Sequence, residues 1–156
     1  AFGARVIAVT SSDAKAERVK SLGAHHAINR QAVPAWEQEV LHLTGGRGAD
    51  HVVEAIGPAT LEKSLKAVAF GGQLTLVGVF GSQDTSFPAS ALSGRMVTLR
   101  RVAVGSRAAF EAMNRAIDFH QLRPVIDRVF PFAEAHAAYR HFESRGHFGK
   151  VAIHIA

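Results

Sequence analysis

Cysteine is absent from the 156 residues of the sequence. Disulfide bonds and metal sites with thiolate ligands are therefore excluded within these residues. No apolar run approaches the roughly 20 residues that a membrane-spanning helix needs, so we expect no membrane partner and a cytoplasmic location. The sequence also lacks a Gly-x-Ser-x-Gly turn and a pair of carboxylates spaced for acid–base catalysis. Neither of these two patterns therefore nominates a catalytic residue.

Charge and histidine content suggest two further kinds of site that the sequence pattern does not favour. The chain carries 18 Lys and Arg against 13 Asp and Glu, but the cations are spread along it, so no nucleic-acid partner is expected. Among its 9 histidines, His136, His141 and His147 lie outside the i, i+4 spacing that places two imidazoles on one helix face. We therefore expect no metal site.

Strand-like and helix-like segments alternate along most of the chain, and the hydrophobic content of 47% is enough for one sizeable core. Strand-like stretches cover residues 5–9, 27–29, 51–56, 73–77 and 95–104, and helix-like stretches cover residues 14–22, 35–44, 60–70 and 108–120. Thr60 is the expected N-cap of the third helix. This alternation predicts an α/β fold with a parallel sheet covered on both faces.

The pattern of predicted strands and helices changes near residue 123. A strand is expected over residues 125–130, a helix over residues 133–144 and a last strand over residues 150–155. We therefore divide the chain into a domain of residues 1–122 and a β-α-β tail of residues 123–156. Aromatic side chains are expected to form the core of this tail; they are Phe130, Phe132, Tyr139 and Phe142.

Several stretches in this order resemble one known family. They are Gly-Ala-Arg-Val-Ile-Ala-Val at residues 3–9, Lys-Ser-Leu-Gly-Ala-His-His-Ala-Ile-Asn at 20–29, Thr-Gly-Gly-Arg-Gly-Ala-Asp-His-Val-Val-Glu at 44–54, Gly-Gly-Gln-Leu-Thr-Leu-Val-Gly at 71–78 and Phe-Gly-Lys-Val at 148–151. Together they are similar to the cofactor-binding half of the medium-chain dehydrogenase/reductase superfamily, and within it to zinc-type alcohol dehydrogenases and quinone oxidoreductases. The resemblance covers essentially the whole chain.

The resemblance implies a Rossmann-type, doubly wound parallel sheet and a tail that returns to the catalytic domain in the family. It also implies hydride transfer between a nicotinamide cofactor and an alcohol, carbonyl, enone or quinone. The family's first strand and glycine-rich loop precede the part that this chain matches, as does the catalytic domain with its zinc ligands. We therefore expect the sheet to lack that strand and loop, the chain alone to be inactive, and any zinc ligands to lie outside it.

The end of the first strand-like stretch bears on cofactor choice. NAD-specific relatives carry an acidic residue there that binds the ribose hydroxyls, whereas this sequence has Thr10. Small hydroxyl groups and cations follow; they are Ser11, Ser12, Lys15 and Arg30. Such groups suit a 2′-phosphate, so we predict NADP(H), with NAD as the alternative. Two points leave the choice open: Ser12 or Asp13 can serve only as a helix N-cap beside a solvated Lys15, and Asp13 can approach a ribose.

Further cofactor contacts are expected where the other parallel strands end, because ligands of open α/β sheets bind at the carboxyl ends of the strands. The candidates are Ala55, Ile56 and Gly57 after one strand, Gly78, Val79 and Phe80 after the next, and Gly105, Ser106 and Arg107 after the third. Glycine permits close backbone approach to a flat ring. The alternative is that Gly57 and Gly78 only form turns.

The leading prediction is the nucleotide-binding half of an NADP(H)-dependent oxidoreductase with a small-molecule substrate. Residues 95–104 have the character of an edge strand, and relatives often pair such strands, so we expect an antiparallel homodimer. One alternative is a non-catalytic module with an oligomer interface. Another is a methyltransferase-like nucleoside binder, which is disfavoured because its ribose-binding acid is missing as well.

A sheet without its central strand would leave residues 6–9 and 52–56 about two strand spacings apart, roughly 9–10 Å. We expect either that the two half-sheets close up and pair directly, or that an upstream segment or another chain fills the space between them.

Overall fold

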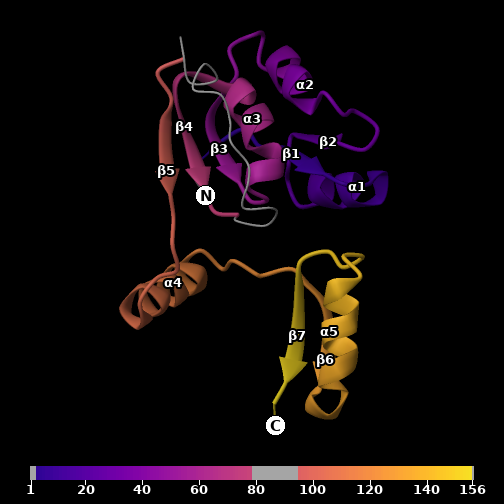
Figure 1. Cartoon of the computed structure of the whole chain (residues 1–156). Helices are drawn as coiled ribbons and strands as arrows, with labels where there is room; N and C mark the ends of the chain where they lie inside the picture. Colours follow the sequence, from indigo (N-terminus) through magenta and orange to yellow (C-terminus); the bar gives the residue numbers. More distant parts are fainter. Residues whose placement is uncertain (1–2, 79–94, 156) are drawn as a thin grey trace. The chain divides into compact units, whose positions relative to one another are not determined.

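The computed structural model describes residues 3–78 and 95–155 (Figure 1). The chain divides into two compact units, residues 2–104 and residues 105–156. The division at residue 122 that the sequence suggested stays a prediction. In the described ranges, no helix combines the length and the apolar character needed to cross a membrane.

The first unit begins with a βαβ element. Strand β1 (Ile7–Thr10) leads into helix α1 (Asp13–Ser21), and strand β2 (His26–Asn29) returns beside β1. The two strands are parallel, with Thr10 opposite Asn29. Ser12 caps α1 by accepting a hydrogen bond from the backbone N–H of Lys15 (3.3 Å), and Gly23, at φ +101°, follows the end of the helix. A glycine is the residue that tolerates this left-handed conformation.

Helix α2 (Trp36–Leu43) connects this element to a second sheet of three parallel strands. The strands are β3 (Ala49–Glu54), β4 (Val68–Leu76) and β5 (Thr98–Arg101), and their order is β3-β4-β5. Helix α3 (Pro58–Ala67) packs on this sheet through Leu61 and Leu65, which join Val68 and Leu74 in one buried cluster. The predicted α/β fold with parallel strands is confirmed.

The boundaries of α3 and of the third strand-like stretch differ from the prediction. The helix begins at Pro58 after Gly57, not at Thr60, since proline suits the first position of a helix, where no N–H partner is needed. The helix ends at Ala67 instead of Phe70, because the fully buried Val68 pairs with Ala49 of β3 and starts β4. The expected strand at residues 95–104 is shorter, covering only the four exposed residues of β5.

The facing edges of β1 and β3 are not paired, and the described strands form separate sheets, β1-β2 and β3-β4-β5. A cleft of about 910 Å³ is lined by Ile7 and Val9 of β1 and by Val52 of β3. Direct pairing of the two half-sheets, one of the two alternatives expected from the sequence, is therefore not what this structure shows. The other alternative, a further strand in this space, stays a prediction.

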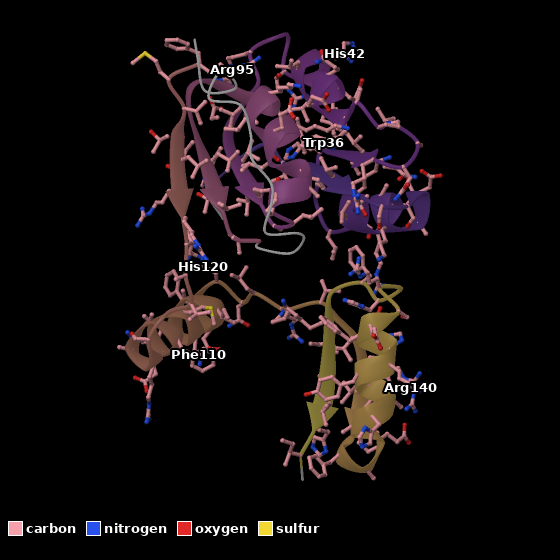
Figure 2. The ribbon with its side chains drawn as sticks, viewed as in Figure 1. Trp36, His42, Arg95, Phe110, His120 and Arg140 are labelled. Carbon is pink, nitrogen blue, oxygen red and sulfur yellow. The ribbon has the colours of Figure 1, made fainter. Side chains whose placement is uncertain are left out.

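A shared core explains why the two half-sheets keep this separation. Trp36 of α2, labelled in Figure 2, is 6% exposed. It packs with residues from both sides of the cleft. The cluster contains Ile28, Val40 and Ala67, with Ile7, Leu43 and Ala49 at its margin. Because α2 and α3 also pack on each other, the helix layer is continuous where the strand layer is not.

The second unit consists of two parts. Helix α4 (Arg107–Phe119) has no buried residue. Strands β6 (Ile126–Pro131) and β7 (Lys150–His154) are parallel, and a 3₁₀ turn (Phe132–Glu134) and helix α5 (Ala135–Glu143) connect them. The predicted aromatic core is wrong in part. Phe130 of β6 is buried, but Phe132, Tyr139 and Phe142 are 66%, 70% and 58% exposed. The reason is that a single helix covers only one face of a two-stranded sheet.

Candidate cofactor site

The carboxyl ends of β1 and β2 bring the first group of predicted residues together. The backbone N–H of Arg30 donates to the carbonyl oxygen of Thr10 (2.9 Å), so these two residues are neighbours across the strand pair. Arg30 also lines the cleft between β1 and β3. Ser11 and Ser12 follow Thr10 directly and are half-buried. The structure thus brings three hydroxyl-bearing residues and one arginine together at the end of β1.

Ser12 and the neighbouring Asp13 both form hydrogen bonds within the protein at this strand end. Ser12 is the N-cap of α1, as the alternative interpretation proposed, although a hydroxyl that accepts one hydrogen bond still has its own O–H to donate. The Asp13 carboxylate accepts a hydrogen bond from the Asn29 side-chain amide (2.8 Å). The Asn29 amide oxygen in turn accepts from the backbone N–H of Gln31 (3.0 Å). Asp13 is therefore tied to the end of β2.

The second group lies where β3 and β4 end. The N–H of Gly78 donates to the carbonyl of Glu54 (3.0 Å), which brings the end of β4 against the β3–α3 turn. A Cβ atom on Gly78 would stand 2.2 Å from the carbonyl oxygen of Ala55. Gly57 has φ +112°, a conformation that other residues rarely adopt. Both glycines are thus required by the backbone, whatever they contact besides.

Ala55 and Ile56 of this turn are exposed and line the cleft. Val79 and Phe80, the remaining candidates after β4, lie outside the described residues. Gly105, Ser106 and Arg107 belong to the second unit. There, Ser106 caps α4 by accepting from the N–H of Ala109 (3.3 Å), and Arg107 forms an exposed ion pair with Glu111 (2.8 Å).

Glu54 is the residue of this region that the sequence analysis missed. It is 4% exposed, and its carboxylate accepts hydrogen bonds from both the β3–α3 turn and helix α3. One signal was available in the sequence. Glu54 is a charged residue at the end of an apolar strand-like stretch, three residues before the Gly57–Pro58 pair that begins a helix, and such a residue needs hydrogen-bond partners if it is buried.

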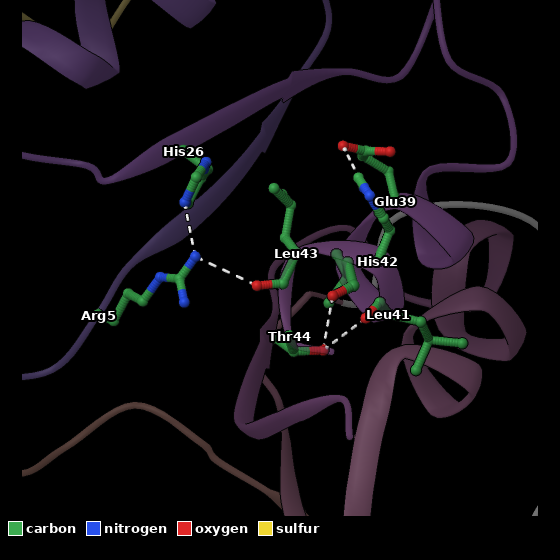
Figure 3. A network of polar contacts seen from close by, with 8 residues as sticks. Arg5, His26, Glu39, Leu41, His42, Leu43 and Thr44 are labelled. Atoms are coloured by element: carbon green, nitrogen blue, oxygen red, sulfur yellow. Dashed lines mark hydrogen bonds and ion pairs between the residues drawn. The ribbon is translucent and has the colours of Figure 1, made fainter. Parts of the chain in front are cut away.

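The amino ends of the strands carry a separate polar network with a structural role (Figure 3). The Arg5 guanidinium contacts Nε2 of His26 (2.7 Å) and donates to the carbonyl of Leu43 (3.2 Å), tying β2 to the end of α2. Nearby, hydrogen bonds from Arg47 lower the pKa of the Asp50 carboxyl and raise that of Arg47. These contacts lie away from the carboxyl ends, where the candidate cofactor residues gather.

The sequence matches a family of known enzymes. Residues 1–119 fit the family model described as zinc-binding dehydrogenase. The chain is 36% identical over 159 residues to a zinc-type alcohol dehydrogenase-like protein of Schizosaccharomyces pombe, covering 99% of this chain and 46% of that protein. It is 30% identical over 168 residues to a 2-haloacrylate reductase of a Burkholderia species, covering 97% of this chain and 48% of that protein. The chain thus spans about half the length of both relatives.

Solved structures agree with this match. The fold superimposes on an NAD-dependent alcohol dehydrogenase with a TM-score of 0.88 and 35% identity, covering 99% of this chain and 45% of the other. It also superimposes on an alcohol dehydrogenase from Thermus sp. ATN1 with a TM-score of 0.82 and 26% identity, covering 97% of this chain and 45% of the other. In both comparisons, the matched region is again about half of the longer chain.

Proposed function

Because the chain belongs to the zinc-binding dehydrogenase family of medium-chain dehydrogenases/reductases, as the cofactor-binding part of an oxidoreductase, we propose that it binds NADP(H) in preference to NAD(H). The observation that carries this proposal is the hydrogen bond between Arg30 and Thr10, which brings an arginine to the end of β1. In a site for an unphosphorylated ribose, an acidic residue is typical at that position.

The chemistry of these groups favours a phosphate. A guanidinium group and small hydroxyl groups form charge-assisted hydrogen bonds to phosphate oxygens, and Thr10 brings no negative charge to repel them. The nearby carboxylate of Asp13 already accepts from Asn29 (2.8 Å). We therefore assign Thr10, Ser11, Ser12, Lys15 and Arg30 to the adenosine 2′-phosphate. NAD(H) remains the alternative cofactor, as in the NAD-dependent relative of known structure.

The residues at the ends of β3 and β4 suit the nicotinamide half of the cofactor. The backbone approach of Gly78 to Ala55 leaves no side chain between the two strand ends, and Ala55 and Ile56 present small or apolar groups to the cleft. We extend this assignment to Gly57, Val79 and Phe80, and to Gly105, Ser106 and Arg107 of the second unit. We further propose that residues 123–156 join the catalytic domain.

A bound nicotinamide supplies or accepts a hydride, and we propose an alcohol, carbonyl, enone or quinone as its reaction partner. The names of the relatives support this range, since they include a zinc-type alcohol dehydrogenase-like protein and a 2-haloacrylate reductase. Residues 3–78 and 95–155 contain no group of three or more side chains that could hold a metal ion, so we assign no zinc ligand.

The test is a comparison of kcat/KM with NADPH and NADH in the intact protein. The substrates are a panel of primary alcohols, aldehydes, enones and quinones, each at saturating concentration while the cofactor is varied. We expect turnover with at least one class and a higher kcat/KM with NADPH. A higher value with NADH would contradict the cofactor assignment. Binding of neither dinucleotide would favour the alternative function, a non-catalytic module.

A further inference from the structure

Glu54 is a buried carboxylate that the proposed cofactor contacts do not use. It is the last residue of β3 and is 4% exposed. In the described part of the chain, no Lys, Arg or His forms an ion pair with it. A buried carboxylate without a cation is costly unless several hydrogen-bond donors surround it.

Four donors meet this carboxylate. Oε1 accepts from the backbone N–H groups of Ile56 (2.8 Å) and Gly57 (2.9 Å) and from the hydroxyl of Thr60 (2.8 Å). Oε2 accepts from the hydroxyl of Ser64 (2.5 Å). The Glu54 carboxylate is therefore fully engaged within the β3–α3 turn and the first two turns of α3.

These contacts place a negative charge of the protein itself at the N-terminus of α3. The N-cap residue, Gly57, has no side chain for capping, and its own N–H, one of the free N–H groups at the start of the helix, donates to the carboxylate (2.9 Å). The positive end of the helix dipole stabilises the charge in return. A cofactor phosphate at this helix end would be repelled by the Glu54 carboxylate, so the N-terminus of α3 does not suit the pyrophosphate.

The same contacts fix the direction of two peptide groups. In a planar trans peptide, the C=O and the N–H point in opposite directions. Because the N–H of Ile56 points at Glu54, the carbonyl of Ala55 points away from the carboxylate, where it lies next to Gly78. Because the N–H of Gly57 also points at Glu54, the carbonyl of Ile56 is turned away from the carboxylate as well. The turn thus directs its N–H groups toward the Glu54 carboxylate and its carbonyl oxygens away from it.

We propose that Glu54 is a positioning residue for the cofactor. Its carboxylate holds the turn at residues 55–57 so that the turn offers hydrogen-bond acceptors to the ligand, and it excludes phosphate from the end of α3. The part of the cofactor that meets this turn is then a hydrogen-bond donor, such as a ribose hydroxyl or a carboxamide N–H, and not a phosphate. This inference rests on the proposed dinucleotide-binding function.

Three substitutions at Glu54 test the role of its carboxylate in the intact protein. Glu54→Gln keeps an oxygen for the turn and can donate its amide N–H to the Ser64 hydroxyl oxygen, so wild-type cofactor affinity is expected. Glu54→Leu leaves the N–H groups of Ile56 and Gly57 without acceptors, and about a tenfold or greater rise in the Kd and KM for the cofactor is expected. Glu54→Asp retains the charge, but its shorter side chain cannot accept from the N–H groups of Ile56 and Gly57 at the same distances, and an intermediate rise is expected. The kcat at saturating cofactor should change little in all three.

Two control variants separate positioning from general stability. Glu62→Leu makes the same exchange on α3 at an exposed carboxylate that pairs with Lys66 (2.7 Å), and it should leave the Kd unchanged. Ser64→Ala removes only the contact to Oε2, which does not hold the turn, and it should lower the melting temperature without raising the Kd.

The outcomes are decisive in each direction. Wild-type cofactor affinity in a folded Glu54→Leu protein would overturn the inference, as would an equal rise in Kd for Ser64→Ala and Glu54→Leu. If Glu54→Leu does not fold, Glu54→Asp decides by the same comparison with Glu54→Gln: a raised Kd supports the inference, and an unchanged Kd overturns it. Failure of the wild-type protein to bind any dinucleotide would instead refute the proposed function itself.

Discussion

Gly78 approaches Ala55 so closely that a methyl group on Gly78 would stand 2.2 Å from the Ala55 carbonyl oxygen. We expect Gly78→Ala to push the ends of β3 and β4 apart and to cost about 1–3 kcal/mol of unfolding free energy, because the atoms it meets belong to the backbone. Urea denaturation measures this cost. Gly146→Ala is the control, since its nearest neighbour, the Ser144 hydroxyl, would lie at an ordinary 3.5 Å. Equal stability of the two variants would contradict the expectation.

The charges at the end of β1 lead to a prediction on cofactor choice. Replacing Lys15 and Arg30 by Ala in the intact protein should weaken NADPH far more than NADH, since each charge-assisted hydrogen bond to a phosphate is worth about 1.5–3 kcal/mol. We expect roughly a tenfold or greater loss per residue for NADPH. Lys20→Ala is the matched control on the same helix, because Lys20 pairs with Glu17 (2.9 Å). Equal losses for NADPH and NADH would refute the assignment of these residues to the 2′-phosphate.

The order and type of most elements could be predicted because the segments carry local signals. Gly23 follows α1 at φ +101°, a conformation that glycine adopts without strain. Pro58, which begins α3, is a local signal of the same kind, but the prediction began that helix at Thr60 instead. The end of α3 could not be predicted, since Val68 and Ala69 continue an apolar pattern compatible with either state. Their strand conformation depends on pairing with β3, a contact between residues distant in sequence.

The site shows the same limit. Strand ends could be located from the sequence, and this was enough to predict that Thr10 and Arg30 follow two of them. The hydrogen bonding of the Glu54 carboxylate includes the hydroxyls of Thr60 and Ser64, which reach it only once α3 has folded back over the end of β3. The exposure of Phe132 and Tyr139 could not be predicted either, because hydrophobic character alone does not reveal whether one or both faces of a sheet are covered.

The outer edge of β5 yields a prediction on assembly. The N–H of Val102 donates to Leu76 of β4 (3.0 Å), so the alternate residue Arg101 directs its N–H away from β4. We expect an antiparallel homodimer through this edge, and Arg101→Pro should shift it toward monomer by removing an outward donor. Light scattering coupled to size-exclusion chromatography measures the mass. The control is Arg100→Ala, which leaves the outward N–H groups intact. A monomeric wild-type protein at high concentration would contradict the prediction.

The core around Trp36 yields a prediction on stability. Trp36 is the single tryptophan of the sequence and packs with Ile28 of β2 and Ala67 of α3, so it joins the two half-sheets. Trp36→Ala should cost about 3–5 kcal/mol of unfolding free energy through the cavity that it leaves. Circular dichroism in urea follows this loss in the variant. Val33→Ala, at a position that is 39% exposed, should change stability little. A smaller loss of unfolding free energy for Trp36→Ala than for Val33→Ala would show that the helix layer does not hold the two half-sheets together.

The cleft between β1 and β3 yields the last prediction, which concerns residues 1–156 expressed by themselves. Val9 and Val53, which line it, are 38% and 63% exposed, and the facing strand edges have no partner among the described strands. Because the strand layer is interrupted between β1 and β3, the carboxyl ends of the two half-sheets stand apart, whereas dinucleotide binding needs several neighbouring strand ends. We therefore expect no measurable dehydrogenase activity from this segment and a Kd for NADPH weaker than micromolar. Isothermal titration of the isolated segment with NADPH measures the Kd, and the intact protein under the same conditions is the reference. Micromolar binding by the isolated segment would show that the half-sheets need no strand between them to form the site.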